Sequence, residues 1–191
     1  PVSVSEGPLG SGLLDRLRLR WRRFRASYDR GPAETVAAAI PDDIVGLPVV
    51  GPPGIRPDAA SLYPGWEYGE AGDVDALLDR DPALGAIVAE YGAGSLGVEE
   101  PGDLAGFDRE IHDYHVSGGL ASSQAYQRSV VRTVTERLRL RGADVLVAGA
   151  LRDLADAGLG VLTSDGTPKE SHDALAAGFE PVQAFLIDPV A

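Results

Sequence analysis

Apolar residues recur at helical spacing along much of the chain, and this pattern predicts a protein built mainly from helices. Residues 13–28 form one apolar face from side chains three or four positions apart: Leu13, Leu17, Trp21, Phe24 and Tyr28. A longer stripe predicts a helix that starts at Ser122 or Ser123 and ends at Arg141, with Gly142 as its C-cap. Further helices are expected over residues 33–40, 74–80, 82–91, 103–117 and 144–157. The last of these is largely apolar, so we expect it at the centre of the protein.

Residues 41–65 do not fit this helical pattern. They contain six prolines and four glycines, and proline at this density favours extended chain over helix or central strand. The same stretch carries six branched apolar residues, which a solvated linker does not need. We therefore expect an extended arm that lies on the protein's own body or on a neighbouring subunit. Beyond residue 158, short strands are expected over 160–163 and 182–187, with a small helix over 171–177 between them.

Together these elements predict a mainly α fold. Its centre is a small helical bundle over about residues 72–158, which follows a basic N-terminal helix and an extended, proline-rich N-terminal arm. The C-terminal piece is short and mixes strand with helix. The expected domain boundaries are therefore 1–71, 72–158 and 159–191. A body of this size buries only about 60–65% of its unfolded surface, which favours assembly with other chains.

Composition removes several classes of protein. The 191-residue chain has no cysteine, which excludes disulfide scaffolds, thiolate zinc sites and cysteine nucleophiles. No apolar run is long enough to span a membrane, and residues 1–10 lack the pattern of a secretory signal. We therefore expect a cytoplasmic or virion location. Lysine occurs once and asparagine not at all, which indicates a high-GC genome, while the net charge of −12 would also suit a halophilic host.

Residues typical of catalysis or metal binding are few. Glu110, His112 and His115 lie close together on one predicted helix and are the best metal-ligand candidates, but their spacing is not that of a metalloprotease helix. Ser171, His172 and Asp173 are adjacent in sequence, whereas the groups of a catalytic triad converge from distant positions. The glycine-rich pieces match neither the P-loop nor the dinucleotide fingerprint. We accordingly predict no catalytic residue, no metal and no cofactor.

The strongest feature of the sequence is a basic segment on an acidic body. Residues 1–30 contain seven arginines against three acidic residues, a balance of +4, so the rest of the chain carries −16. The candidate binding residues surround the apolar stripe of the first predicted helix: Arg16, Arg18, Arg20, Trp21, Arg22, Arg23, Phe24 and Arg25. This helix would dock on an acidic neighbouring subunit or on its own body, bind nucleic-acid phosphates, or lie on an anionic membrane.

The acidic body offers the basic helix a built-in partner, so subunit docking is the favoured interpretation. It predicts a non-enzymatic structural subunit of a homo-oligomeric ring with other assembly proteins, such as the head–tail connector or adaptor of a tailed virus. An oligomer held by these charges should loosen as salt is added. The alternative is a nucleic-acid-associated protein that binds phosphates through the arginine-rich helix.

Overall fold

The computed structural model describes residues 29–53, 55 and 57–184, and its centre is a parallel β-sheet. The sheet has four strands in the order β1 (Val50–Gly51), β2 (Ala59–Leu62), β3 (Ile87–Tyr91) and β5 (Val145–Ala148). Each strand lies beside the next one in this series, and every pairing is parallel. The prediction of a mainly α bundle is therefore wrong: the fold is α/β.

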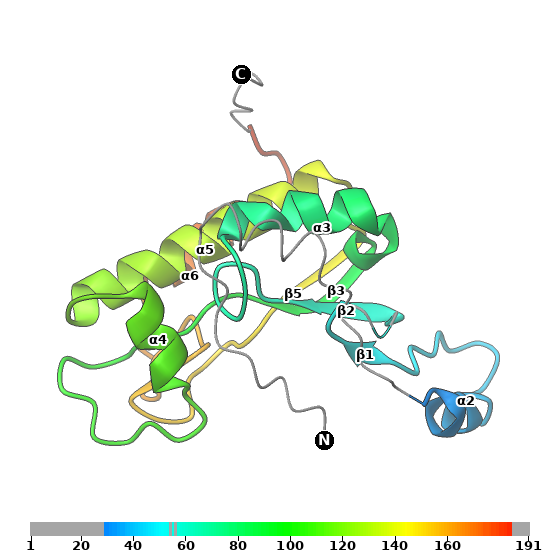
Figure 1. The fold of residues 1–191 in the computed structure, drawn as a ribbon, viewed down its shortest axis with the longest axis horizontal. Helices are drawn as coiled ribbons and strands as arrows, with labels where there is room; N and C mark the ends of the chain where they lie inside the picture. The colour runs from blue at the N-terminus through cyan, green and yellow to red at the C-terminus, as the bar shows by residue number, and fades with distance from the viewer. Residues whose placement is uncertain (1–28, 54, 56, 185–191) are drawn as a thin grey trace.

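Helices connect the strands along one face of the sheet. Strand β2 leads through α3 (Val74–Arg80) to β3, and β3 leads through α4 (Arg109–His115) and α5 (Leu120–Leu140) to β5. Figure 1 shows α3 and α5 on the same side of the strands, with α6 (Glu170–Gly178) along α5. Sequential parallel strands with their helices on one face are the arrangement of an arc of an α/β barrel.

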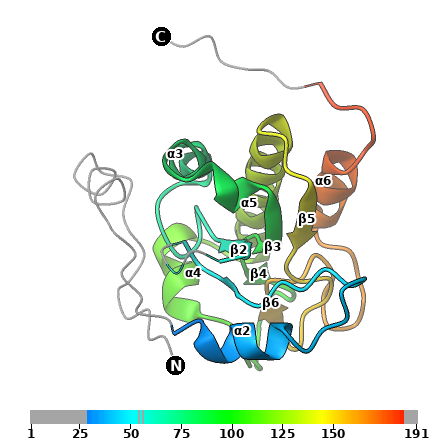
Figure 2. The same cartoon turned by 90° about the vertical axis from the view of Figure 1, so that its right-hand side faces the viewer.

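The remaining elements are short. Helix α2 (Gly31–Ala37) precedes the sheet and buries none of its residues. The 3-10 turns η1 (Ala71–Asp73) and η2 (Pro82–Gly85) flank α3. Strands β4 (Ser95–Leu96) and β6 (Ala157–Gly158) form a separate antiparallel pair. In Figure 2 the helices α3, α5 and α6 lie along one side of the molecule and α2 lies on the opposite side. None of the helices in the described part of the chain is long and apolar enough to cross a membrane.

The core lies between the sheet and α3 and α5. Its strand residues Leu62, Val88 and Tyr91 are fully buried, and α5 contributes Val130, Val134 and Leu138. The Thr135 hydroxyl donates its proton to the Val131 carbonyl. In its 2.7 Å hydrogen bond with Tyr91 it is therefore the acceptor, and the Tyr91 hydroxyl is the donor. The stripe predicted on the long helix is thus confirmed as its core-facing side.

Several predicted elements are wrong in the same direction, since strands replace helices or an arm. Residues 87–91 form β3 and not the second half of a helix. The stretch 144–157 forms the edge strand β5 and a loop, where we expected a central helix. Residues 41–65 supply β1 and β2 and contribute to the core, so the expected extended arm on a surface is instead part of the sheet itself. Residues 160–163 form only isolated bridges, and 182–184 form no strand.

Candidate functional site

Strand β3 has a β-bulge next to Glu90. Ala60 and Ser61 of β2 pair with Val88 and Glu90, so β3 has one residue more than its neighbour at this point. The pairing of β3 with β5 shows the same irregularity between Val88 and Tyr91. The extra residue places both Val88 and Tyr91 in the core, and Glu90, one of the two residues between them, is half-buried.

Two neighbouring strand ends supply groups that surround Glu90. The Glu90 carboxylate lies close to Tyr63, the residue after β2, and acts on its hydroxyl. Burial first, and then this carboxylate, raise the pKa of Tyr63 above its usual range, so the phenol stays protonated. On the other side Gly149 follows β5, and a Cβ atom there would lie 2.6 Å from Glu90 Cγ. Only glycine at position 149 allows the Glu90 side chain to keep its present position.

Glu67 lies in the turn directly after Tyr63. Two backbone hydrogen bonds hold this turn. The Glu67 N–H donates to the Tyr63 carbonyl at 3.0 Å, and the N–H of Gly65, whose φ is 81°, donates to the Tyr68 carbonyl at 2.9 Å. The pKa of Glu67 is raised by burial first, and then by the negative charges of Glu90 and Asp108. Glu67 therefore holds a proton more strongly than an exposed glutamate does.

Aromatic side chains fix the position of this turn. Trp66 is buried, and its ring centroid lies 6.0 Å from that of Phe107 and 6.1 Å from that of His115. His115 Nε2 donates to the Trp66 carbonyl at 2.9 Å, and the Tyr126 hydroxyl donates to the carbonyl of Gly65. The turn that carries Glu67 is thus held in place by side chains of α4 and α5, and a fixed position is what a functional side chain requires. We call Tyr63, Glu67 and Glu90 the strand-end site.

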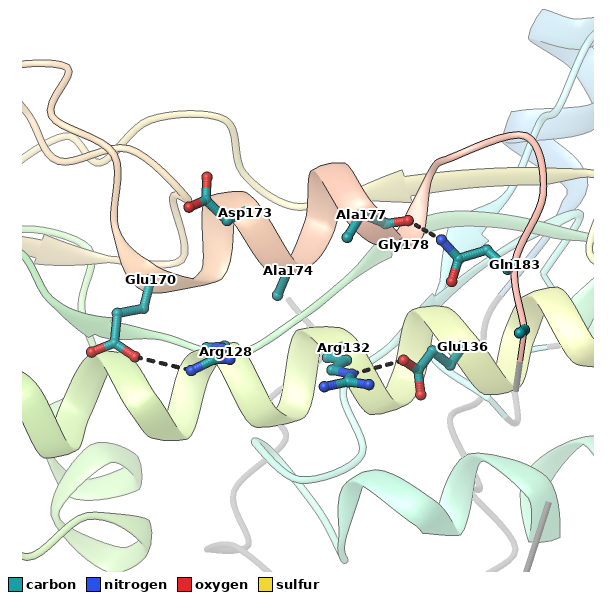
Figure 3. A pocket seen from close by; sticks show the side chains of 10 residues that line it. Arg128, Arg132, Glu136, Glu170, Asp173, Ala174, Ala177, Gly178 and Gln183 are labelled. Atoms are coloured by element: carbon teal, nitrogen blue, oxygen red, sulfur yellow. Dashed lines mark hydrogen bonds and ion pairs between the residues drawn. The ribbon is translucent and has the colours of Figure 1, made fainter. Parts of the chain in front are cut away.

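A groove of about 580 Å³ lies elsewhere, between α5 and α6 on the helical side of the molecule (Figure 3). Its cations already have partners: Arg128 faces Glu170 at 3.7 Å, and Arg132 pairs with Glu136 at 2.7 Å. The groove therefore offers no free charge of either sign at these positions, and it does not adjoin the strand-end site.

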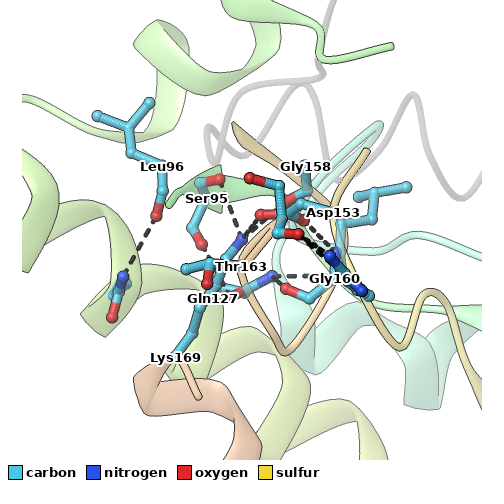
Figure 4. A network of polar contacts seen from close by, with 12 residues as sticks. Ser95, Leu96, Gln127, Asp153, Gly158, Gly160, Thr163 and Lys169 are labelled. Carbon is cyan, nitrogen blue, oxygen red and sulfur yellow. Dashed lines mark hydrogen bonds and ion pairs between the residues drawn. The ribbon is translucent and has the colours of Figure 1, made fainter. Parts of the chain in front are cut away.

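A buried polar network supports the chain just beyond the strand ends (Figure 4). The Gln127 amide accepts from the hydroxyls of Ser95 and Ser171 and donates to the carbonyls of Ala93 and Gly160. This one side chain joins α5 and α6 to the segments that follow β3 and β6. Its hydrogen bond with Ser95 also holds the β4–β6 pair in place, because Ser95 belongs to β4.

An ion pair completes the network. Lys169 Nζ lies 2.5 Å from Asp153 Oδ2, and both side chains have no exposed surface. Burial raises the pKa of Asp153 and lowers that of Lys169, and each shift is opposed by the partner's charge. The Gly160 N–H donates to Asp153 Oδ1 at 2.8 Å, whereas Oδ2 has the Lys169 ion pair but accepts no well-formed hydrogen bond.

The predicted candidates occupy other places. The arginine-rich candidates, Arg16, Arg18, Arg20, Trp21, Arg22, Arg23, Phe24 and Arg25, lie outside the described residues. Ser171 contributes to the Gln127 network, while His172 pairs with Asp173 on the surface at 3.0 Å. Within the described ranges, no three histidine and acidic side chains are grouped as a metal ion would require.

His112 has a structural explanation. Its Nδ1 lies 2.8 Å from Asp113 Oδ1 and its Nε2 lies 2.9 Å from Ser123 Oγ. The Asp113 carboxylate accepts, so Nδ1 carries a proton and donates to it, and Ser123 Oγ also accepts from the Leu96 N–H. The order of groups resembles a Ser-His-Asp triad, but Ser123 is completely buried and no substrate can reach its hydroxyl. The chain of hydrogen bonds instead fastens α4 to α5.

Sequence reasoning missed all three residues of the strand-end site. Glu90 was assigned to a helix, on which an acidic residue is ordinary surface. A signal was nevertheless present: Glu90 follows the apolar run 86–89 and precedes Gly92, as expected of a residue at the end of a buried parallel strand.

Comparison with known proteins identifies the fold. No family model and no curated protein matches the sequence. Among solved structures, a β-glucuronidase of Parabacteroides merdae matches 93% of this chain with a TM-score of 0.54 and 14% identity. β-Glucuronidase 2 of Bacteroides uniformis, with covalently bound cyclophellitol-6-carboxylate aziridine, matches 65% with a TM-score of 0.45 and 20% identity.

These matches cover only part of the larger proteins. The chain corresponds to 30% of the P. merdae protein and to 15% of the B. uniformis protein. At such identity the likeness concerns the fold alone. The chain thus shares its α/β fold with a part of an enzyme, a glycoside hydrolase.

Proposed function

We propose that this chain carries part of a glycoside-processing site, in which Glu67 and Glu90 act as a pair of carboxyl groups. The observation that carries the proposal is the strand-end site itself: Glu90 near the end of β3, and Tyr63 and Glu67 just after the end of the adjacent parallel strand β2. In α/β barrels, catalytic residues come from the C-terminal ends of the strands. The fold shared with the P. merdae β-glucuronidase supports this assignment by analogy.

The two carboxyl groups suit different steps of glycoside hydrolysis. That reaction needs one carboxylic acid to protonate the leaving oxygen and one carboxylate on the other side of the sugar. Glu67, whose pKa is raised by burial and by Glu90 and Asp108, is suited to be the acid. We assign the role of the carboxylate to Glu90, which adjoins the protonated Tyr63 hydroxyl.

In the retaining version of the reaction, a Glu90 oxygen attacks the anomeric carbon while the bond to the leaving oxygen breaks. Glu67 transfers its proton to that oxygen, and a glycosyl ester on Glu90 results. Water then attacks the anomeric carbon, Glu67 takes up a proton of that water, and the ester bond breaks. Both glutamates return to their starting protonation states.

The charges around the site favour an uncharged sugar. The described charges that act on Glu67 are Glu90 and Asp108, both negative. Lys169, the one lysine of the chain, is committed to Asp153. A uronate would add a third negative charge to this environment, so we expect neutral glycosides to bind better than glucuronides.

Covalent labelling tests this proposal, since an aziridine related to a sugar is opened by an ionised carboxylate. The full chain is incubated with cyclophellitol aziridine or with its 6-carboxylate, and adducts are located by intact mass and peptide mapping. We expect one adduct on Glu90, formed faster with the neutral reagent and lost in Glu90→Gln. Glu136→Gln, an exposed carboxylate on α5, is the matched control and should label normally.

Two results would refute the proposal: no adduct in protein that is folded by circular dichroism, or labelling that persists in Glu90→Gln. Hydrolysis of 4-nitrophenyl β-glucoside provides a second readout, which should fall in both Glu90→Gln and Glu67→Gln.

The expectations of a virion connector and of nucleic-acid binding rest on the arginine-rich segment, and no described residue supports them. The enzyme-related fold favours the glycoside proposal over a purely structural role.

A further inference from the structure

An exposed loop leads from the strand ends to α4. It comprises residues 97–107, and all of these except Gly97, Pro101, Leu104 and Phe107 are exposed. Figure 1 shows this segment, which we call the 97–107 loop, beside α4. In α/β barrels the loops that follow the C-terminal ends of strands border the active site. A loop with so few buried residues is held firmly only where it has specific attachments.

Asp156, directly before β6, supplies four of these attachments. Its Oδ2 atom accepts from the backbone N–H groups of Gly102 and Asp103, both at 2.9 Å. Its own N–H donates to the Asp103 carbonyl at 3.0 Å, and its carbonyl accepts from the Gly97 N–H at 2.7 Å. The hydrogen bonds from Asp103 and then Gly102 hold the pKa of Asp156 below its usual range, so at neutral pH the carboxylate is ionised and remains an acceptor.

Further hydrogen bonds fold the second half of the loop on itself. Asp103 Oδ1 accepts from the Ala105 N–H at 3.0 Å. The Phe107 N–H donates to the Leu104 carbonyl at 3.0 Å. The stretch from Asp103 to Phe107 is therefore a turn that is held at its first residue by Asp156.

The other end of this turn lies at the strand-end site. The ring centroid of Phe107 is 6.0 Å from that of Trp66, the residue before Glu67. The next residue, Asp108, is the N-cap of α4, and its charge is one of the causes that raise the pKa of Glu67, after burial and Glu90. The position in which the loop ends therefore affects the charge around Glu67.

We propose that Asp156 is a positioning residue of the strand-end site: through the 97–107 loop, its carboxylate keeps Phe107 and Asp108 against the turn that carries Glu67. The proposal rests on the proposed function in treating Glu67 as the acid of a glycoside-processing pair. That acid must be protonated before it can transfer its proton to the leaving oxygen. A carboxylate held close to it favours the protonated form, so Asp156 acts through the loop and not by contact with the sugar.

Loss of the Asp156 carboxylate tests the proposal in the full chain. Asp156→Ala should make the Gly102 and Asp103 amides exchange with solvent roughly tenfold to a hundredfold faster, as measured by NMR hydrogen exchange. It should also lower the pKa of Glu67, as measured from the pH titration of its carboxyl carbon, because Asp108 is no longer held nearby. A purely local role of Asp156 would change the amide exchange alone.

Asp156→Asn separates the effect of position from that of charge. The amide oxygen of asparagine can accept the same two N–H groups, so both measurements should stay closer to wild type than in Asp156→Ala. Asp165→Ala is the matched control, because the exposed Asp165 also accepts a backbone N–H, that of Thr167 at 3.1 Å, but in another turn. This control should leave the pKa of Glu67 unchanged.

Asp103→Ala interrupts the same path at its next step, since it removes the acceptor of the Ala105 N–H and keeps the backbone bonds to Asp156. It should lower the pKa of Glu67 as well. An unchanged Glu67 titration in Asp156→Ala or in Asp103→Ala would overturn the proposal. A shift in Asp156→Asn as large as that in Asp156→Ala would also overturn it, because the cause would then be the lost charge.

These outcomes are distinguishable from failure of the proposed function. Neither measurement needs turnover, so both decide the positioning role even if Glu90 forms no aziridine adduct. If Glu67 is the acid, the alkaline limb of 4-nitrophenyl β-glucoside hydrolysis should also move to lower pH in Asp156→Ala, since less Glu67 is protonated at a given pH. A lowered pKa of Glu67 beside an unmoved limb would refute the acid role of Glu67 and leave the positioning role standing.

Discussion

Replacing Lys169 by methionine should destabilise the fold strongly, because it leaves the Asp153 carboxylate buried without its cation. The two side chains have no exposed surface, and Nζ lies 2.5 Å from Oδ2. Removing one partner of a buried ion pair costs about 3–5 kcal/mol. For a chain of this size, 1 kcal/mol shifts Tm by roughly 2–4 °C, so Lys169→Met should lower Tm by about 6–20 °C.

The double variant Lys169→Met/Asp153→Leu should recover part of this loss, because no charge is left buried. Its remaining cost comes from the Gly160 N–H, which loses its acceptor Asp153 Oδ1 at 2.8 Å. An unsatisfied buried donor costs about 1–3 kcal/mol. The double variant should therefore be more stable than Lys169→Met alone.

Urea unfolding and thermal melts followed by circular dichroism measure these differences. Arg132→Met is the control, since its 2.7 Å pair with Glu136 is exposed and should contribute less than about 1 kcal/mol. The reasoning would be refuted if Lys169→Met were no less stable than Arg132→Met, or if the double variant were less stable than Lys169→Met.

Three further predictions concern the strand-end site and its surroundings. Folding raises the pKa of Glu67, so its contribution to stability is fully present below about pH 4.3, the unfolded pKa, and is lost as the pH rises through the folded pKa. Urea titrations between acidic and neutral pH should show this decline in wild type, and Glu67→Gln should abolish it. Gly94→Ala places a Cβ 2.7 Å from the Trp66 ring and should cost about 1–3 kcal/mol in the same assay. Gly149→Ala places a Cβ 2.6 Å from Glu90 Cγ and should slow aziridine labelling, and unchanged labelling would show that the Glu90 side chain is not fixed there.

The helices that the sequence predicted well are those whose signals are local. The long helix was expected from residue 122 or 123 to 141 and is found at Leu120–Leu140, followed by Gly142 with φ of 79°. Its apolar stripe and its terminal glycine need no information from elsewhere in the chain. The predictions of α2, α3 and α6 are confirmed for the same reason.

The strands were not predicted because a short apolar run does not distinguish a buried strand from a buried helix. Residues 87–91 were interpreted as helix, and so were 145–148, although two of these four residues are β-branched. Proline and glycine in 41–65 concealed two more strands. With the strands lost, the sheet and the site at its end were lost as well.

By itself, the sequence determined the helical elements, the absence of cysteine chemistry and the acidic charge, since each depends on neighbouring residues or on composition. Only the tertiary structure decided that β2, β3 and β5 lie side by side, because strand pairing joins segments up to about sixty residues apart through hydrogen bonds that no local pattern encodes. The bulge beside Glu90 exists only within that sheet. A site built from strand ends is therefore a property of the folded chain, and its residues acquire their chemistry when the strands are paired.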